Sequence, residues 1–187
     1  MQDYNEYLSE VLIPSEVLQQ RIAELGEQIS RDYNEKGELV LVCILRGGVL
    51  FLTDLMRKIS IPHAIEFMAV SSYGVGGREA TGQVRITLDL NLDIYNRHVI
   101  LVEDIIDSGH TISAVIDFLA TRHPASISVC TLLDKEERRE VNVPIRYRGF
   151  TIPNKFVFGY GLDIDDYYRN LPFIGVVDLE KYEAPAA

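Results

Sequence analysis

The feature that most limits the fold of this chain is a buried-strand pattern that runs directly into a loop and a helix. Residues 99–102 are four consecutive apolar residues, as expected for a parallel strand that is buried on both faces. One stripe of apolar side chains then repeats at helical spacing: Ile112, Val115, Ile116 and Leu119. A strand, a loop and a helix in this order are typical of α/β proteins, so the segment predicts a parallel sheet covered by helices.

The same unit occurs earlier in the chain. The apolar run Leu39–Leu45 ends at Arg46, Gly47 and Gly48 and passes into a helical pattern over residues 49–59. A helix is also expected over Ser15–Tyr33, with Ser15 as its N-cap. Further strands are expected over residues 65–70, 84–90, 127–133, 145–150 and 155–158. This alternation predicts a doubly wound, mainly parallel α/β sheet that binds ligands beyond the carboxyl ends of its strands.

Composition limits the class of partner. With 187 residues and a net charge of -10, the chain suits one domain and argues against a broad basic surface for nucleic acid or anionic membranes. An anionic substrate would need helix N-termini, a few placed basic residues or a divalent cation. Cys43 and Cys130 sit in apolar runs without metal spacing, so we expect buried thiols in a reducing compartment. A polar N-terminus and the lack of a long apolar run predict a cytoplasmic protein.

The loop after residues 99–102 combines acids with a helix start suited to phosphate. Its residues are Glu103, Asp104, Ile105, Ile106, Asp107, Ser108, Gly109, His110 and Thr111. Free amides at the helix N-terminus favour a phosphate, whereas carboxylates accept hydrogen bonds from ribose hydroxyls and attract Mg²⁺. Both halves together suit a sugar phosphate. The plainer alternative is that Asp107 or Ser108 is only an N-cap and that Glu103 and Asp104 are solvated.

The segment VILVEDIIDSGHT resembles the phosphoribosyl pyrophosphate motif of the type I phosphoribosyltransferases. The segments ILRGG, SSYG, TLLDKEERRE and FVFGYGLDIDDYYRNLPFIG resemble, in order and spacing, the bacterial hypoxanthine (hypoxanthine-guanine) branch. The resemblance covers about residues 41–177. It implies the type I fold as one domain over residues 1–187, with a core over about residues 35–160 and a small hood made by the chain ends.

For the sugar and its phosphate, the resemblance implies four roles. Glu103 and Asp104 would bind the ribose hydroxyls and Mg²⁺, and the stretch from Asp107 to Thr111 would wrap the 5'-phosphate. Asp107 would also be the general base near purine N7. The family often has Lys where this chain has His110, so the charge at that position becomes pH-dependent.

For the purine, the resemblance implies that Lys135 donates to O6, that Phe156 stacks on the ring and that the Val157 backbone binds its edge. Asp163 would lie near the base and hold a second Mg²⁺ on the pyrophosphate. Without the resemblance, Lys135 would be read as a solvated lysine, Phe156 as a core residue and Asp163 as a surface charge.

For the pyrophosphate, the resemblance implies contacts with Arg46, Gly47 and Arg169. The family often has a non-proline cis peptide in the turn that holds Arg46 and Gly47. The loop over residues 71–82 resembles a lid whose Ser72 and Tyr73 exclude water from the reaction. A plain hairpin tip is the alternative.

The function implied is transfer of 5-phosphoribose from phosphoribosyl pyrophosphate to hypoxanthine or guanine, giving IMP or GMP and pyrophosphate in purine salvage. A homodimer or homotetramer is expected, since the family commonly forms them. Two rivals remain: an RNA-binding regulator built on the same fold, which should have a basic face, and a phosphate-binding domain without transfer chemistry. The second rival would leave Lys135, Phe156, Asp163 and Arg169 as unrelated coincidences.

Overall fold

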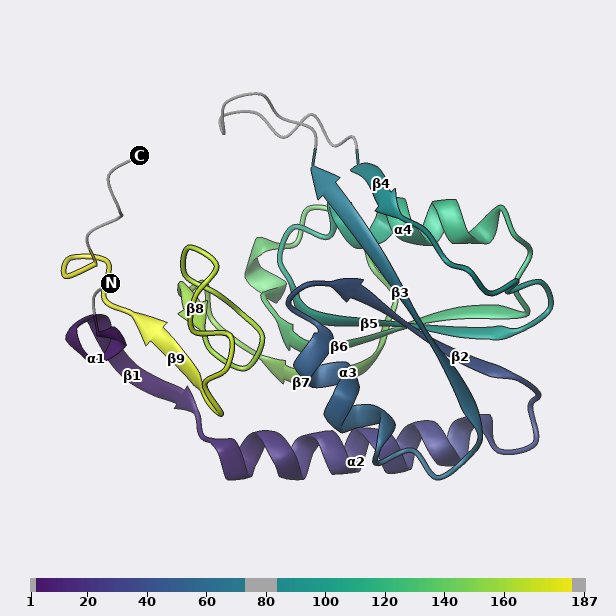
Figure 1. The fold of residues 1–187 in the computed structure, drawn as a ribbon, viewed down its shortest axis with the longest axis horizontal. Helices are drawn as coiled ribbons and strands as arrows, with labels where there is room; N and C mark the ends of the chain where they lie inside the picture. Colours follow the sequence, from purple (N-terminus) through teal and green to yellow (C-terminus); the bar gives the residue numbers. More distant parts are fainter. Residues whose placement is uncertain (1–2, 73–83, 183–187) are drawn as a thin grey trace.

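The computed structural model describes residues 3–72 and 84–182, which form two sheets and the helices around them (Figure 1). The helices are α1 (Tyr4–Tyr7), α2 (Ser15–Tyr33), α3 (Val49–Met56), α4 (His110–Ala120) and the 3-10 turn η1 (Glu136–Arg138). The strands are β1 (Leu8–Ile13), β2 (Leu39–Leu45), β3 (His63–Ser72), β4 (Val84–Leu88), β5 (His98–Ile106), β6 (Ser126–Asp134), β7 (Ile145–Thr151), β8 (Val157–Phe158) and β9 (Ile174–Val177).

The larger sheet has the strand order β4-β3-β2-β5-β6-β7. All its neighbouring strands run parallel except β4, which pairs antiparallel with β3. Strand β2 is buried along almost its whole length, as its uninterrupted apolar run requires. The predicted doubly wound, mainly parallel sheet is therefore confirmed.

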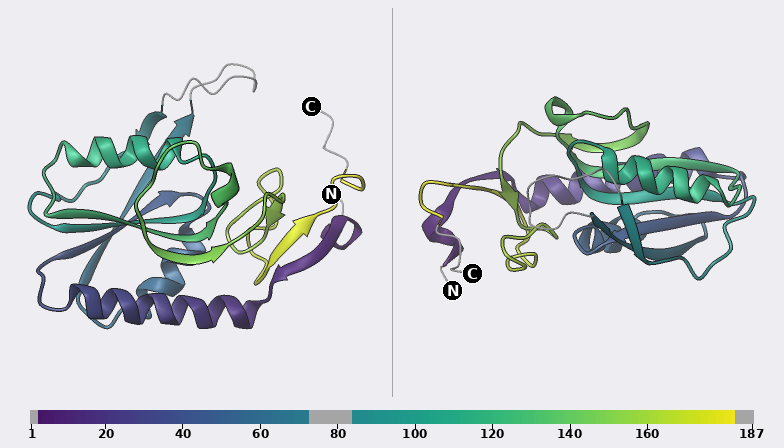
Figure 2. Two further views of the ribbon diagram at one scale, coloured as in Figure 1. Left: turned by 180° about the vertical axis from the view of Figure 1, so that it is seen from behind. Right: turned by 90° about the horizontal axis from the view of Figure 1, so that it is seen from above.

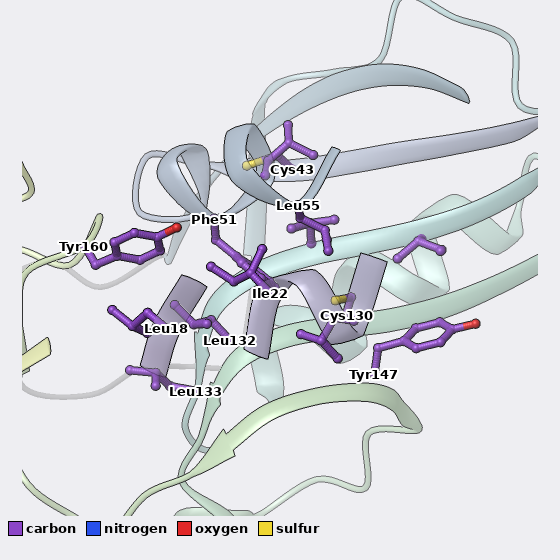
Figure 3. Close-up of a cluster of buried hydrophobic side chains, with 14 of the residues drawn as sticks. Leu18, Ile22, Cys43, Phe51, Leu55, Cys130, Leu132, Leu133, Tyr147 and Tyr160 are labelled. Atoms are coloured by element: carbon purple, nitrogen blue, oxygen red, sulfur yellow. The ribbon is translucent and has the colours of Figure 1, made fainter. Parts of the chain in front are cut away.

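Helices cover both faces of this sheet (Figure 1). One face packs on α2 and α3, whose apolar stripes include the fully buried Leu18, Ile22 and Phe51 (Figure 3). The other face packs on α4 through Ile112 and Val115, among others. The two cysteines, Cys43 and Cys130, are free thiols that are buried, as predicted, in the core between the sheet and helices α2 and α3. In the described residues, no helix is long and apolar enough to span a membrane.

The smaller sheet has the strand order β1-β9-β8 and joins the two ends of the chain. Both pairs are antiparallel, with Val11 opposite Gly175 and Val157 opposite Val176. Figure 2 shows this sheet as a separate layer at one end of the molecule, which is the predicted hood. The strands β1 and β9 themselves were not predicted, because their pairing joins segments that lie more than 150 residues apart.

Several predicted boundaries were wrong. Pro14, rather than Ser15, is the N-cap of α2, and Ser15 is its first residue. Helix α3 ends at Met56, before residue 59. The most consequential correction concerns β5, which continues through Ile106, so that the predicted loop acids Glu103 and Asp104 belong to a strand.

Candidate active site

The crevice of the site follows from the strand order. The chain passes from β2 to β3 on one side and then returns to β5 on the other side of β2. At such a switch point the loops after two neighbouring parallel strands separate and leave room for a ligand. The turn after β2 and the carboxyl end of β5 do meet there: a Cβ atom built on Gly47 would lie 1.6 Å from Asp104 Oδ2. Only glycine allows this approach.

The loop between β5 and α4 forms a small cavity. The cavity has a volume of about 170 Å³ and is lined by Glu103, Ile105, Ile106, Asp107, Ser108, Gly109, Thr111 and Ile112. Gly109 is the N-cap of α4 with a φ of 92°, and no side chain caps the helix. The alternative that Asp107 or Ser108 is only an N-cap is therefore wrong. The first amides of α4 are left without a capping side chain, which is the arrangement that favours an anion.

Neighbouring segments hold this loop in place. The backbone N-H groups of Glu140 and Val141 both donate to the Ser108 carbonyl oxygen, at 2.9 and 3.1 Å. His110 lies at the first turn of α4, with Nε2 at 2.9 Å from Glu140 Oε2. A charged form of His110 would thus be paired with a carboxylate, and the backbone remains the main source of positive potential for the loop.

Glu103 and Asp104 sit at the floor of the crevice. Glu103 has 8% of its surface exposed, so the alternative that it is a solvated loop acid is wrong. Burial, and then the charge of Asp104, raise the pKa of Glu103 well above its usual value. Burial raises the pKa of Asp104 to about 6, against hydrogen bonds from backbone amides and the charge of Arg169, which lower it. A cation bound near either carboxylate would favour its ionised form.

The register of β5 and β6 brings Asp107 and Lys135 together. Ile106 is opposite Asp134 in this parallel pair, so the next residue of each strand leaves the sheet at the same place. Lys135 Nζ lies 3.9 Å from Asp107 Oδ2. Only 8% of Lys135 is exposed, and the alternative of a solvated lysine is therefore wrong. Its amide also donates to the Ile106 carbonyl oxygen at 3.0 Å, which ties the two loops together.

Basic residues that sequence reasoning missed surround this pair. Arg138 Nε donates to Asp107 Oδ1 at 3.0 Å. Behind Lys135, the buried Asp134 carboxylate pairs with Arg139 and, at 2.8 Å, with Arg148. The run DKEERRE was a visible signal of charge, but only the register of β5 and β6 shows that it faces the loop.

Two of the predicted purine contacts, Phe156 and Val157, lie on the hood. Phe156 is 48% exposed, so the alternative of a core residue is wrong, and its ring is open to stacking. Strand β8 is at the edge of its sheet. Because the Phe156 carbonyl accepts from Val177 at 2.9 Å, the alternation of an antiparallel ladder turns the polar groups of Val157 away from β9. The Val157 backbone is therefore free of that ladder.

The predicted pyrophosphate residues come from two distant segments that meet. Arg169 Nη2 lies 2.7 Å from Asp163 Oδ1, and Asp166 Oδ1 lies 2.7 Å from Arg46 Nη2 and 3.2 Å from Arg169 Nη2. Sequence reasoning missed Asp166. The hydrogen bond from Arg169, and then the charge of Arg46, lower the pKa of Asp166. A cis peptide is present in the turn, between Leu45 and Arg46 and not between Arg46 and Gly47.

The predicted lid is described only at its edges. Ser72 is the last residue of β3, and Tyr73 lies outside the described residues. Strand β4 resumes at Val84, so the two strands that flank the segment pair antiparallel, with Ser72 opposite Val84. The lid therefore stays a prediction.

Comparison with known proteins identifies the class. Residues 14–165 match the family model described as "Phosphoribosyl transferase domain", and the chain belongs to that family. It is 50% identical over 171 residues to hypoxanthine phosphoribosyltransferase of Salmonella typhimurium, covering 91% of this chain and 96% of the relative. It is also 50% identical over 181 residues to hypoxanthine-guanine phosphoribosyltransferase of Mycobacterium bovis, covering 94% and 89%.

Solved structures agree with this assignment. A crystal structure of a hypoxanthine phosphoribosyltransferase from Staphylococcus aureus superposes with a TM-score of 0.92 at 42% identity, covering 97% of each chain. The ternary substrates complex of a mutant hypoxanthine phosphoribosyltransferase from Trypanosoma cruzi has a TM-score of 0.89 at 41% identity, covering 95% of this chain and 100% of that chain. The fold is therefore that of the type I phosphoribosyltransferases, as the loop motif predicted.

Proposed function

We propose that this protein transfers 5-phosphoribose from phosphoribosyl pyrophosphate to hypoxanthine or guanine, giving IMP or GMP and pyrophosphate in purine salvage. The observation that carries the proposal is the placement of Asp107 and Lys135, 3.9 Å apart beside the phosphate loop. A purine with O6 near Lys135 would have its imidazole edge near Asp107. The names of the relatives support the same reaction.

The residues divide the chemistry between them. Purine N9 attacks C1 of the ribose, and pyrophosphate leaves with the electron pair of the broken C–O bond. The proton displaced from the base passes to the Asp107 carboxylate, which also stabilises positive charge developing on the sugar. The loop amides from Ser108 to Thr111 hold the 5'-phosphate, so that the ribose carbon is fixed in front of the purine.

Lys135 gives the selectivity for a 6-oxopurine. An ammonium group can only donate, and an exocyclic amino group cannot accept its hydrogen bond in the way that O6 can. Because Lys135 is buried, an unmet donor would be costly, so adenine should be rejected. Phe156 would stack on the base, and the free backbone edge of Val157 would select among 6-oxopurines.

Mg²⁺ is the cofactor that the acids fit. Glu103 and Asp104 are adjacent carboxylates whose pKa values are raised by burial, and an arriving cation would relieve that cost. No cluster of three or more metal-binding side chains exists in the described residues. This suits a Mg²⁺ that takes most of its ligands from substrate and water. Asp163 would hold a second Mg²⁺ beside the pyrophosphate, where it would neutralise the charge of the leaving group.

The remaining parts of the proposal concern setting and assembly. The chain would act as one domain, with the lid residues Ser72 and Tyr73 closing over the bound substrates. We further propose a cytoplasmic homodimer or homotetramer that binds neither nucleic acid nor membranes. The net charge of -10 supports the last point and disfavours an RNA-binding regulator on this fold.

The test is a direct assay of the wild-type protein with phosphoribosyl pyrophosphate, Mg²⁺ and each of four bases: hypoxanthine, guanine, xanthine and adenine. We expect nucleotide from hypoxanthine or guanine and none above background from adenine. A reaction without Mg²⁺ is the control. If no 6-oxopurine gives a nucleotide, the proposed function is wrong, and a phosphate-binding domain without transfer chemistry becomes the better account.

A further inference from the structure

A partly buried polar network of Tyr160, Asp54 and Gln19 lies behind the pyrophosphate half of the site. The Tyr160 hydroxyl donates to Asp54 Oδ2 at 2.5 Å, and Gln19 Nε2 donates to the same oxygen at 2.7 Å. The three residues come from the loop between β8 and β9, from α3 and from α2. Tyr160 is only 4% exposed, and Figure 3 shows its ring lying along the edge of the core, close to Leu18 and Phe51.

The backbone around Tyr160 needs such an anchor. Tyr160 has a φ of 48°, and its neighbours Gly159 and Gly161 have φ values of 92° and 101°. The left-handed region is disfavoured for a residue with a side chain, so tertiary contacts must select this conformation. Two hydrogen bonds hold Tyr160: its hydroxyl donates to Asp54, and its backbone N-H donates to the Leu171 carbonyl oxygen at 2.9 Å.

Gly161, the residue after Tyr160, contacts the pyrophosphate turn. A Cβ atom built on Gly161 would lie 2.1 Å from the Gly47 carbonyl oxygen, so the two backbones are in direct contact. The Gly161 N-H donates to the Arg169 carbonyl at 2.8 Å, and Arg169 Nη1 donates to the Gly161 carbonyl at 2.7 Å. One residue thus touches the turn on one side and holds both ends of Arg169 on the other.

Helix α3 connects the pyrophosphate turn to Asp54, the partner of Tyr160. It begins at Val49, directly after the turn that contains Arg46 and Gly47, and it carries Asp54 one and a half turns later. The turn and the loop of Tyr160 are therefore fixed to the same short helix. A shift of Tyr160 would move Gly161 against Gly47 and change the distance between the turn and Arg169.

We propose that Tyr160, held by Asp54, is a positioning residue that sets the width of the pyrophosphate site between Gly47 and Arg169. The inference rests on the proposed function for the identity of the ligand. It adds a residue that does not itself contact substrate and that acts on one half of the site. Binding of pyrophosphate and phosphoribosyl pyrophosphate should depend on it, whereas binding of the purine and the 5'-phosphate should not.

The protein contains a matched control for this claim. Tyr147 is also fully buried, and its hydroxyl donates to Asp32 Oδ2 at 2.8 Å. Figure 3 shows Tyr147 and Tyr160 on opposite sides of the core cluster. Both hydroxyls serve a tyrosine-aspartate pair, so removing either one should cost similar stability, but only Tyr160 borders the site.

The experiment compares Tyr160→Phe with Tyr147→Phe in the forward and reverse reactions. For Tyr160→Phe we expect the KM values of phosphoribosyl pyrophosphate and of pyrophosphate to rise about tenfold, with kcat and the KM of IMP within about twofold of wild type. Tyr147→Phe should lower the melting temperature without moving any KM. Asp54→Asn keeps an acceptor oxygen and should restore most of the affinity that Asp54→Ala loses.

Three outcomes would overturn the proposal: an unchanged pyrophosphate KM in Tyr160→Phe, an equal rise in the KM of IMP, or an equal rise in Tyr147→Phe. Calorimetric titration of each folded variant with pyrophosphate and Mg²⁺ gives the same comparison without turnover. If wild type makes no nucleotide but Tyr160→Phe still weakens pyrophosphate binding, the proposed function fails and the positioning role stands.

Discussion

The two halves of the proposed site, which we call the loop half and the hood half, would hold phosphates by different means. The loop from Asp107 to Thr111 is contiguous, leaves a single strand and offers mainly backbone amides at the start of α4. The hood half consists of the turn near residue 47 and the loop over residues 159–169. It would rely on charged side chains that already pair with one another. The first half is preformed by local sequence, whereas the second is assembled by tertiary contacts.

This difference explains how a chain with a net charge of -10 can hold so anionic a substrate. The loop half needs no basic side chain, because amide dipoles at a helix start already favour an anion. The hood half would rely on Arg46 and Arg169, whose charges pair with Asp163 and Asp166 in this structure. Mutations should therefore separate the two halves kinetically.

The largest effect is expected at Asp107, where the loop half meets the purine. Asp107→Ala should lower kcat by about 10²- to 10⁴-fold, the usual contribution of a general base. Binding of phosphoribosyl pyrophosphate should weaken by less than about threefold, since the loop amides remain. Single-turnover rates and calorimetry measure the two quantities. Asp117→Ala, on the exposed side of α4, is the control, and equal losses of rate and binding would argue against a base at position 107.

Replacement of Asp104 by Asn should lower the activity and raise the stability. Asp104→Asn should lower kcat/KM by about 10²-fold through loss of a charge that attracts Mg²⁺ and ribose hydroxyls. The same change should raise the free energy of unfolding at pH 7 by up to about 3 kcal/mol, because folding raises the pKa of this carboxyl from 3.8 to about 6.

The size of that effect depends on pH. A raised pKa means that the folded state binds more protons than the unfolded state between pH 3.8 and about 6, so stability falls as the pH rises through this window. The stability gained by Asp104→Asn should therefore shrink from pH 7 to pH 5. Urea titrations at both values check this, with Asp117→Asn as control. A variant that is less stable than wild type at pH 7 would contradict the assigned burial cost.

Lys135 should control discrimination between bases. Lys135→Met keeps the apolar stem and removes the donor, so the KM for hypoxanthine should rise about 10- to 100-fold, the value of a hydrogen bond to a charged group. The preference for hypoxanthine over adenine should fall by a similar factor. Initial rates with both bases measure it. Lys155→Met, which removes a lysine on the hood, should leave the preference unchanged; an unchanged preference in Lys135→Met would mean that O6 is read elsewhere.

The smallest effect is expected at Asp166, which competes for the arginines of the hood half. Asp166→Asn should lower the KM for pyrophosphate in the reverse reaction by about two- to fivefold, because exposed ion pairs contribute at most about 1 kcal/mol. Asp165→Asn, a neighbour that pairs with Tyr182 and not with Arg46 or Arg169, is the control. A higher KM in Asp166→Asn would show that this carboxylate orients the arginines rather than competing for them.

The elements of the loop half could be predicted from local sequence pattern, whereas Arg46, Gly47 and Arg169 of the hood half were named only through resemblance. Residues 99–119 carry their strand, loop and helix signals side by side, so β5 and α4 were predicted correctly, although Glu103 and Asp104 proved to be strand residues. The phosphate-binding role of the loop stays a proposal. Lys135 and Phe156 were named only through resemblance. Their burial and exposure, which reversed the plain expectation for each residue type, depend on strand register and on the hood.

The remaining features could not be predicted from sequence, because they depend on contacts between segments that lie far apart in the chain. Strands β1 and β9 pair across the whole sequence, and Tyr160 reaches Asp54 over 106 residues. Asp166 reads as one acid among several in DIDD until Arg46 is brought to it. A local sequence pattern cannot predict such pairs, because neither segment contains a signal that identifies the other.

The separation of the two halves is tested most directly by the reverse reaction of Arg169→Ala. We expect the KM for pyrophosphate to rise by about 10- to 100-fold while the KM for IMP stays within about twofold of wild type. Lys155→Ala, which removes a basic side chain paired with Glu10 on the hood, should change neither value. Equal rises in both KM values would contradict the separation, since they would mean that one shared site binds both phosphates.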